Sequence, residues 1–169
     1  MISFWEKNYN SQEFDVTIIG AGFTGLFSAW FILKENPKAK IAICDASFPP
    51  PAASTRNAGF ACFGSPTEIL EDLSKESEAS VLERIEMRIT GLEDLKSICG
   101  REEINFTDYG GFEIFNDREI GLFEDTASQL SKLNKLLFPS TGQDTFEISD
   151  NSQHSFKNAI RINFEGQIN

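Results

Sequence analysis

Two short apolar runs separated by a helical pattern open the chain. Residues 14–20 (FDVTIIG) are apolar and end in glycine, which is typical of a strand buried on both faces in a parallel sheet. From Gly22 to Pro37 the residues are apolar around most of a helix circumference, which predicts a helix buried on several sides. Residues 40–45 (KIAICD) predict a second strand. Together these elements have the length of one βαβ unit, whose right-handed crossover makes the two strands parallel neighbours.

The middle of the chain predicts a loop and two helices. Three consecutive prolines, 49–51, cannot continue the second strand. Ser65 is placed as the N-cap of the first helix, with proline next and Glu68 positioned to close a capping box. We expect this helix to reach at least Leu73. Apolar residues at helical spacing predict the second helix over 78–99, ending before a glycine.

The last third of the chain predicts antiparallel strands and one more helix. Residues 104–115 (INFTDYGGFEIF) predict a strand, a tight turn or bulge at the glycine pair, and a second strand. A capping sequence at 116–119 predicts a helix that ends before Pro139, followed by a loop to residue 153. Residues 159–164 alternate as an antiparallel strand does.

Composition limits the class of protein and its partners. With 169 residues, 40% hydrophobic and 24% charged, the chain is long enough for a sizeable core and is neither disordered nor membrane-spanning in type. A formal charge of -11 argues against nucleic acid or anionic lipid as a partner. The first twelve residues lack the basic and apolar regions of a secretory signal, so we expect a cytoplasmic protein.

The cysteines and the single histidine do not have the pattern of a metal site. Cys44, Cys62 and Cys99 show no CxxC spacing and are expected to be free thiols packed as small hydrophobes. His154 is the only histidine, which excludes a multi-histidine site within this chain. The sequence therefore predicts no metal.

The strongest candidate site is a glycine motif between the first strand and the first helix. Gly20, Gly22 and Gly25 form G-x-G-x-x-G, in which the glycines allow the turn, the approach of a pyrophosphate and close helix packing. Asp45 lies 20 residues beyond Gly25, at the end of the second strand, where it can accept hydrogen bonds from the ribose of an adenosine. An acid there argues against a 2′-phosphate and hence against NADP. The alternatives are a glycine-rich turn without ligand and a solvated acid at a strand end.

The motif does not by itself separate FAD from NAD, but the segments around it carry a resemblance. DVTIIGAGFTGLFSAWFILKENPKAKIAICDA followed by AASTRNAGF resembles the N-terminus of the D-amino-acid oxidase superfamily of FAD-dependent oxidoreductases, which includes glycine oxidase, sarcosine oxidase and γ-glutamylputrescine oxidase-like enzymes. In that family a Ser/Thr-Arg-Asn-x-Gly stretch wraps the flavin side of the cofactor. The residues that this resemblance and the motif assign to FAD are Gly20, Gly22, Phe23, Thr24, Gly25, Asp45, Ala46, Ser54, Thr55, Arg56, Asn57, Ala58, Gly59 and Phe60. The alternative for residues 54–60 is a surface loop capped by one arginine.

Two later segments extend the resemblance. Residues 109–112 (YGGF) are similar to the start of the family's substrate domain, and residues 164–169 (FEGQIN) to its EGQI(D/N)P turn. The resemblance implies an N-terminal tail over 1–12, the N-terminal part of an FAD-binding domain over 13–100, and a truncated substrate domain over 101–169. It covers nearly all of the chain but only about the first half of a family member. The family's substrate-positioning residues usually lie in the other half, so no catalytic residue is predicted.

The fold class expected from these observations is α/β, with a Rossmann-like FAD-binding βαβ unit followed by helices and the first strands of an antiparallel substrate domain, incomplete in this chain. The resemblance implies oxidation of a small amine or amino acid by hydride transfer to flavin, with oxygen or another electron acceptor. One alternative is a truncated, non-catalytic fragment or half of a split enzyme that needs a second chain. Another is an NAD-dependent dehydrogenase.

Overall fold

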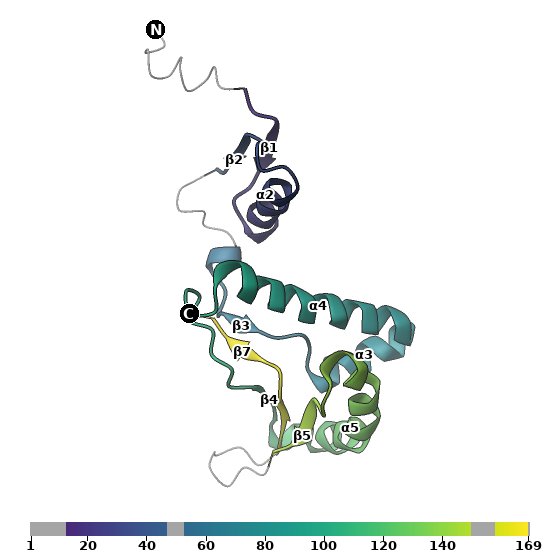
Figure 1. Ribbon diagram of the computed structural model, residues 1–169. Coiled ribbons are helices and arrows are strands. Elements are labelled where there is room, and N and C mark those ends of the chain that lie inside the picture. Colours follow the sequence, from purple (N-terminus) through teal and green to yellow (C-terminus); the bar gives the residue numbers. More distant parts are fainter. Residues whose placement is uncertain (1–12, 47–52, 150–157, 169) are drawn as a thin grey trace. The chain divides into compact units, whose positions relative to one another are not determined.

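A computed structural model describes residues 13–46, 53–149 and 158–168 of the chain. The chain divides into two compact units, residues 1–58 and 59–169, and each is described by itself (Figure 1). The predicted N-terminal tail and His154 lie outside the described residues. The sequence also predicts a boundary near residue 100, between a part of the chain that binds the cofactor and a part that binds the substrate. That boundary stays a prediction.

The first unit contains the expected βαβ arrangement. Strand β1 (Val16–Ile19) leads through helix α2 (Phe23–Glu35) to strand β2 (Ile41–Cys44), and a short 3-10 turn, η1 (Ala53–Thr55), follows. The two strands pair in parallel over their full length, as the sequence pattern predicts. The carboxylate of Asp15 accepts a hydrogen bond from the backbone N–H of Lys40 at 2.8 Å, which ties together the starts of both strands.

The first unit is less buried than its apolar sequence predicts. Among its described residues Ala29 alone is buried, and Ile19 is 82% exposed. The expectation that the first strand is buried on both faces and the helix on several sides is therefore wrong for this chain. The physical reason is that one helix covers one face of a two-stranded sheet, and within the described residues of the unit nothing covers the other.

The second unit contains two small antiparallel sheets. Strands β4 (Gly111–Phe115), β6 (Asn158–Ile162) and β5 (Phe146–Ile148) form a three-stranded sheet in that order. Strands β3 (Phe60–Ala61) and β7 (Gly166–Gln167) form a separate pair, which Figure 1 shows side by side. The structure is thus mixed α/β, as expected for part of a Rossmann-like FAD-binding domain with small antiparallel sheets.

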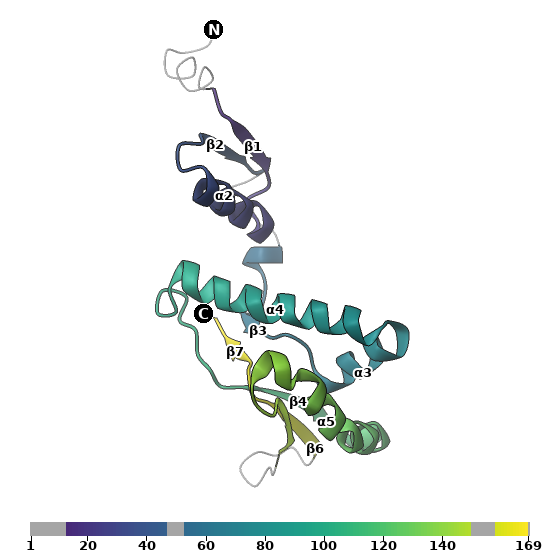
Figure 2. The same cartoon turned by 45° about the vertical axis from the view of Figure 1, so that its right-hand side comes forward.

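Three helices build the core of the second unit. Helix α3 (Pro66–Lys75) contacts both α4 (Glu78–Cys99) and α5 (Ile120–Thr141), and α5 lies against all three strands of the larger sheet (Figure 2). The Oγ atom of Ser65 accepts a hydrogen bond from the Glu68 N–H at 3.4 Å, so the predicted N-cap is confirmed. The core between helices and sheet consists of Phe63, Ile69, Val81, Ile85, Phe115, Leu130, Leu133, Leu137, Phe146, Ile160 and Ile162.

The predicted end of the helix before Pro139 is wrong. Helix α5 continues through this proline to Thr141 and ends at Gly142, which has a left-handed backbone (φ 72°). The N–H of Gly142 donates to the carbonyl of Phe138 at 2.8 Å. A proline in the last turn removes one backbone donor, and the bond that closes the helix beyond it compensates for the loss.

Two strand assignments also need correction. The predicted loop 139–153 contains strand β5, because the Asn134 side chain accepts the N–H groups of Thr145 and Phe146 and donates to the Phe146 carbonyl. The predicted strand from residue 104 is reduced to a single bridge between Thr107 and Gln167.

The cysteines are free thiols, as expected, but the expectation that they are packed as small hydrophobes is wrong. Cys44, Cys62 and Cys99 are all exposed.

Candidate functional site

The glycine turn of the first unit has the geometry that its motif predicts. Gly20 adopts φ 102°, a conformation that residues with a side chain rarely take, and its N–H donates to the Cys44 carbonyl at 2.7 Å. A Cβ atom at Gly25 would lie 2.0 Å from the carbonyl oxygen of Gly20 and 3.3 Å from a methyl group of Ile18. Only glycine at position 25 therefore lets the start of α2 lie against the turn.

The structure brings Ser54 of the following loop to this turn. Its Oγ accepts a hydrogen bond from the N–H of Phe23 at 3.1 Å, and a Cβ at Gly22 would stand 3.1 Å from the same atom. Ser54 thus caps the first residue of α2 from outside the helix. Helix geometry leaves the N–H groups of Thr24 and Gly25 without an intrahelical acceptor, so they remain donors for an anion at this end.

Asp45 lies at the end of β2, as predicted, and touches the glycine turn. Its Oδ2 accepts a hydrogen bond from the N–H of Ala21 at 2.8 Å. The carboxylate therefore holds the turn from the side of the second strand, a role that the spacing of the motif did not indicate. That Asp45 accepts a hydrogen bond from a ribose hydroxyl stays a prediction. Ala46 follows as an exposed residue.

The rest of the predicted loop is exposed. Asn57 donates through Nδ2 to the Ser54 carbonyl at 2.9 Å, and the N–H of Arg56 donates to the Ala53 carbonyl at 3.2 Å. Thr55 and Ala58 are exposed as well. The guanidinium of Arg56 has no carboxylate partner among the described residues, which leaves its charge for a ligand.

The last two predicted cofactor residues belong to the second unit. Gly59 adopts φ 73°, and its carbonyl accepts a hydrogen bond from the N–H of Ile168 at 2.8 Å. Phe60 begins β3 and is 75% exposed. The structure therefore brings together Gly20, Gly22, Phe23, Thr24, Gly25, Asp45 and Ser54 within the first unit, and it holds Gly59 and Phe60 by contacts within the second.

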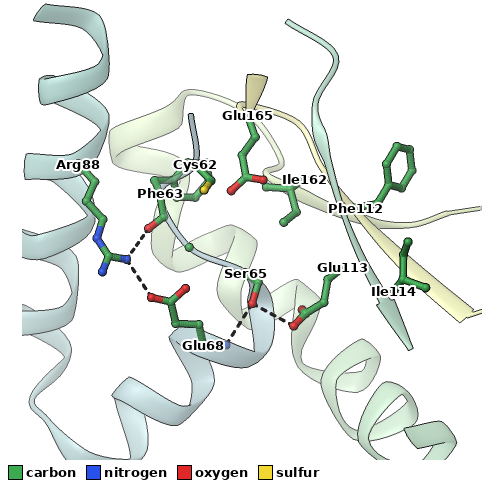
Figure 3. Close-up of a pocket in the computed structure, with 11 residues that line it drawn as sticks. Cys62, Phe63, Ser65, Glu68, Arg88, Phe112, Glu113, Ile114, Ile162 and Glu165 are labelled. Atoms are coloured by element: carbon green, nitrogen blue, oxygen red, sulfur yellow. Dashed lines mark hydrogen bonds and ion pairs between the residues drawn. The ribbon is translucent and has the colours of Figure 1, made fainter. Parts of the chain in front are cut away.

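A surface cavity of about 580 Å³ opens in the second unit (Figure 3). On one side Arg88 donates to the Phe63 carbonyl at 2.8 Å and to the carboxylate of Glu68 at 3.1 Å. On the other side the Ser65 hydroxyl donates to Glu113 at 2.9 Å. These bonds tie α3 to α4 and to β4 around the cavity.

Glu165 is a buried acid at this cavity, with 8% of its surface exposed. Burial raises its pKa to about 7, and the negative charges of Glu68 and Glu113 add to the rise, while hydrogen bonds from the backbone of Phe63 and Gly64 oppose it. Sequence reasoning missed this residue and identified it only as part of a turn. The available signal was an acid directly after an apolar alternating strand.

Cys62 lines the same cavity, and its environment argues against a reactive thiolate. Cys62 is exposed overall, but its partial burial at the cavity raises the pKa of the thiol, the charges of Glu165 and Glu68 raise it further, and Arg88 lowers it. A thiol held in its protonated form is a weak nucleophile and a weak metal ligand. In the described ranges 13–46, 53–149 and 158–168, no group of three or more histidine, cysteine or acidic residues is arranged to hold a metal ion.

Comparison with known proteins gives the family. A family model described as FAD dependent oxidoreductase matches residues 15–161, which is most of the chain and includes the glycine turn, Asp45 and the loop to Phe60. The chain belongs to this family of FAD-dependent oxidoreductases. No curated protein gives a significant match. Within the described part of this FAD-dependent oxidoreductase chain, no helix has the length and apolarity needed to cross a membrane.

Proposed function

We propose that this chain forms the N-terminal portion of an FAD-dependent oxidoreductase of the D-amino-acid oxidase type, acting on a small amine or amino acid. The observation that carries the proposal is the hydrogen bond from the Phe23 N–H to Ser54. It joins the glycine turn, which FAD and NAD sites share, to the loop through Phe60, which resembles the flavin-contacting segment of that family. An NAD-dependent dehydrogenase has no need of this loop.

The residues of the first unit fit the adenosine and pyrophosphate part of FAD. A Cβ at Gly20 would meet no atom within 4 Å, so the turn is open at this point, and the free amides at the start of α2 offer donors to a pyrophosphate. Arg56 supplies a positive charge for the same group, which matters in a chain with a net charge of -11. We assign the ribose to Asp45, whose carboxylate is already fixed against the turn.

The chemistry of the proposed reaction belongs to the cofactor. When bound, FAD would supply the oxidising chemistry by accepting a hydride equivalent from the carbon that bears the amine, and oxygen or another acceptor would then receive the electrons. The part of this chain is to hold FAD and to orient its ring. We retain residues 13–100 as the first part of the FAD-binding domain, residues 101–169 as the first part of the substrate domain, and the cytoplasm as the location.

Anaerobic reduction tests the proposed function without knowledge of the electron acceptor. The purified chain, loaded with FAD, is mixed with glycine, sarcosine, D- and L-amino acids and small amines while the visible flavin band is followed. We expect at least one of these compounds to bleach the band, and the Gly25→Ala variant to lose FAD and the signal together. An FAD-loaded protein that none of them bleaches would contradict the proposed oxidase activity.

A second candidate is an FAD-binding module that requires a second chain for catalysis. The observation that favours it is the set of large apolar side chains exposed in the first unit, namely Phe14, Ile19, Phe23, Leu26, Phe31, Leu33 and Ile43. Exposed apolar surface of this kind promotes association. This candidate predicts aggregation or a stable complex with another protein, and a monodisperse, cooperatively melting monomer would count against it.

A further inference from the structure

Glu165 lies where three segments of the second unit meet. Its carboxyl group hydrogen-bonds with the backbone of Phe63 and Gly64, in the segment that follows β3. On the opposite side it fits against the first residue of β4, because a Cβ at Gly111 would lie 2.0 Å from Oε2 of Glu165. Figure 3 shows the side chain directed into the cavity between these segments. A larger residue at position 111 or a shorter one at 165 would break this contact.

The backbone of the same residue anchors the neighbouring strand pair. The N–H of Gly110 donates to the Glu165 carbonyl at 2.9 Å, immediately before Gly166 and Gln167 form β7. Strand β7 is hydrogen-bonded on one side to β3 and on the other to Thr107. Directly beyond it, the N–H of Ile168 donates to the Gly59 carbonyl. The placement of Gly59 and Phe60 therefore depends on β7, which Glu165 fastens at its start.

The charged and titratable groups facing Glu165 come from every element around it. Glu68 of α3 and Glu113 of β4 are negative, and Arg88 of α4 is positive but is engaged with Glu68 and a backbone carbonyl. Cys62 and Tyr109 line the cavities on either side. Among the described residues that line these cavities, Arg88 is the only cation, so no unshared positive charge balances an ionised Glu165.

We propose that Glu165, in its protonated form, is a positioning residue that holds residues 59–64 against β7 and β4, and that its ionisation loosens this segment. The neutral carboxyl still accepts a backbone N–H, and it avoids placing a third negative charge in a closed, apolar contact with Gly111. An ionised carboxyl gains hydration only when the segment opens and water enters. Because Gly59 and Phe60 are among the residues assigned to FAD, this inference rests on the proposed function for its relevance to the cofactor.

The direction of the pH effect follows from the raised pKa. With a pKa of about 7 in the closed state and an ordinary value of 4.5 in the open state, the closed state binds the proton more tightly. Opening therefore becomes easier as the pH rises from 4.5 and stops changing above 7. Between pH 6 and pH 8 the equilibrium constant for opening is expected to rise about ten-fold.

Hydrogen exchange of the backbone amides of residues 59–64 tests the inference in the full chain. We expect the wild type to lose about ten-fold in protection between pH 6 and pH 8, after correction for the intrinsic rate. The Glu165→Gln variant keeps the shape and the acceptor but not the charge, so its protection should not change. The control Glu147→Gln removes an exposed carboxylate of β5 that does not line the cavity, and it should retain the wild-type pH dependence. An equal loss of protection in wild type and Glu165→Gln, or its disappearance in Glu147→Gln, would overturn the proposal.

Two further measurements keep the test decisive. If Glu165→Gln does not fold, a carbon NMR titration of the wild-type Glu165 carboxyl must give a midpoint that coincides with the loss of protection, and a midpoint near 4.5 overturns the proposal.

Addition of FAD at pH 8 should restore protection of residues 59–64. A chain that binds no FAD at all contradicts the proposed function, but it does not affect the test by the pH dependence of hydrogen exchange. Bound FAD without any change in protection overturns the positioning role toward the cofactor.

Discussion

Replacement of Gly25 by alanine is the perturbation whose outcome the structure defines best. The added Cβ would stand 2.0 Å from the Gly20 oxygen, whereas real Cβ atoms essentially never approach another heavy atom within 3.0 Å. The turn and the start of α2 must therefore separate by at least 1 Å, the difference between these two distances. Overpacking of this kind costs about 1–3 kcal/mol. Alanine gains about 1 kcal/mol over glycine in a helix, so the net loss of stability is about 0–2 kcal/mol.

The effect on the cofactor should exceed the effect on stability. The displaced atoms belong to the turn that we propose as the binding site of the pyrophosphate, so we expect the dissociation constant for FAD to rise by more than about ten-fold, a change of 1.4 kcal/mol. Fluorescence titration with FAD and thermal unfolding measure the two effects.

Gly91→Ala provides the matched control, because a Cβ at this position in α4 has no atom within 4 Å. It should leave FAD binding unchanged and stabilise the protein by about 0.4–1 kcal/mol. A Gly25→Ala variant that binds FAD as the wild type does would refute the reasoning about the turn.

Three further predictions concern individual carboxylates. Asp45→Ala removes the acceptor of the Ala21 N–H and should weaken FAD binding about five- to ten-fold in a calorimetric titration, and unchanged binding would show that Asp45 is dispensable. Glu113→Ala removes the acceptor for the Ser65 hydroxyl and for the hydroxyl and N–H of Thr67, and should lower the free energy of unfolding by about 2–3 kcal/mol in urea. The control Glu147→Ala breaks only an exposed pair with Arg161 and should change it by less than about 1 kcal/mol, and equal effects would contradict the helix-capping role of Glu113. Because the raised pKa of Glu165 means that the folded state holds its proton, the contribution of this residue to stability should be fully present below pH 4.5 and fall by about 3 kcal/mol as the pH rises through 7, and Glu165→Gln should remove this loss. The free energy of unfolding of both proteins is measured by urea titration at several pH values in this range. An equal dependence on pH in wild type and Glu165→Gln would contradict the prediction.

The elements that sequence reasoning predicted correctly are those fixed by local pattern. The βαβ unit and the helix over residues 78–99 follow from apolar periodicity and capping residues that act within a few positions. Strand β5 was missed because three residues in a polar stretch carry little pattern. Their strand conformation depends on the side chain of Asn134, which comes from the preceding helix.

The local geometry of the glycine turn was predictable to the same degree. Gly20 and Gly25 each serve a backbone contact within the unit, and Asp45 lies directly after β2, as the spacing of the motif predicts. The contact between Ser54 and the start of α2 was not predicted, because it joins residues 31 positions apart and the resemblance assigned Ser54 only to the cofactor. The burial of Glu165 arises from Gly111 and the Phe63–Gly64 backbone, which are far from it in sequence. No local pattern encodes such a meeting.

The central proposal is that the glycine turn of the first unit, with Ser54 and Asp45 beside it, binds FAD. Calorimetric titration of the full chain with FAD and, separately, with NAD tests it most directly. The account predicts that FAD binds at least about ten-fold more tightly than NAD, and that Gly25→Ala weakens FAD binding while Gly91→Ala does not. Tighter binding of NAD, or FAD binding that is indifferent to Gly25→Ala, would contradict the claim.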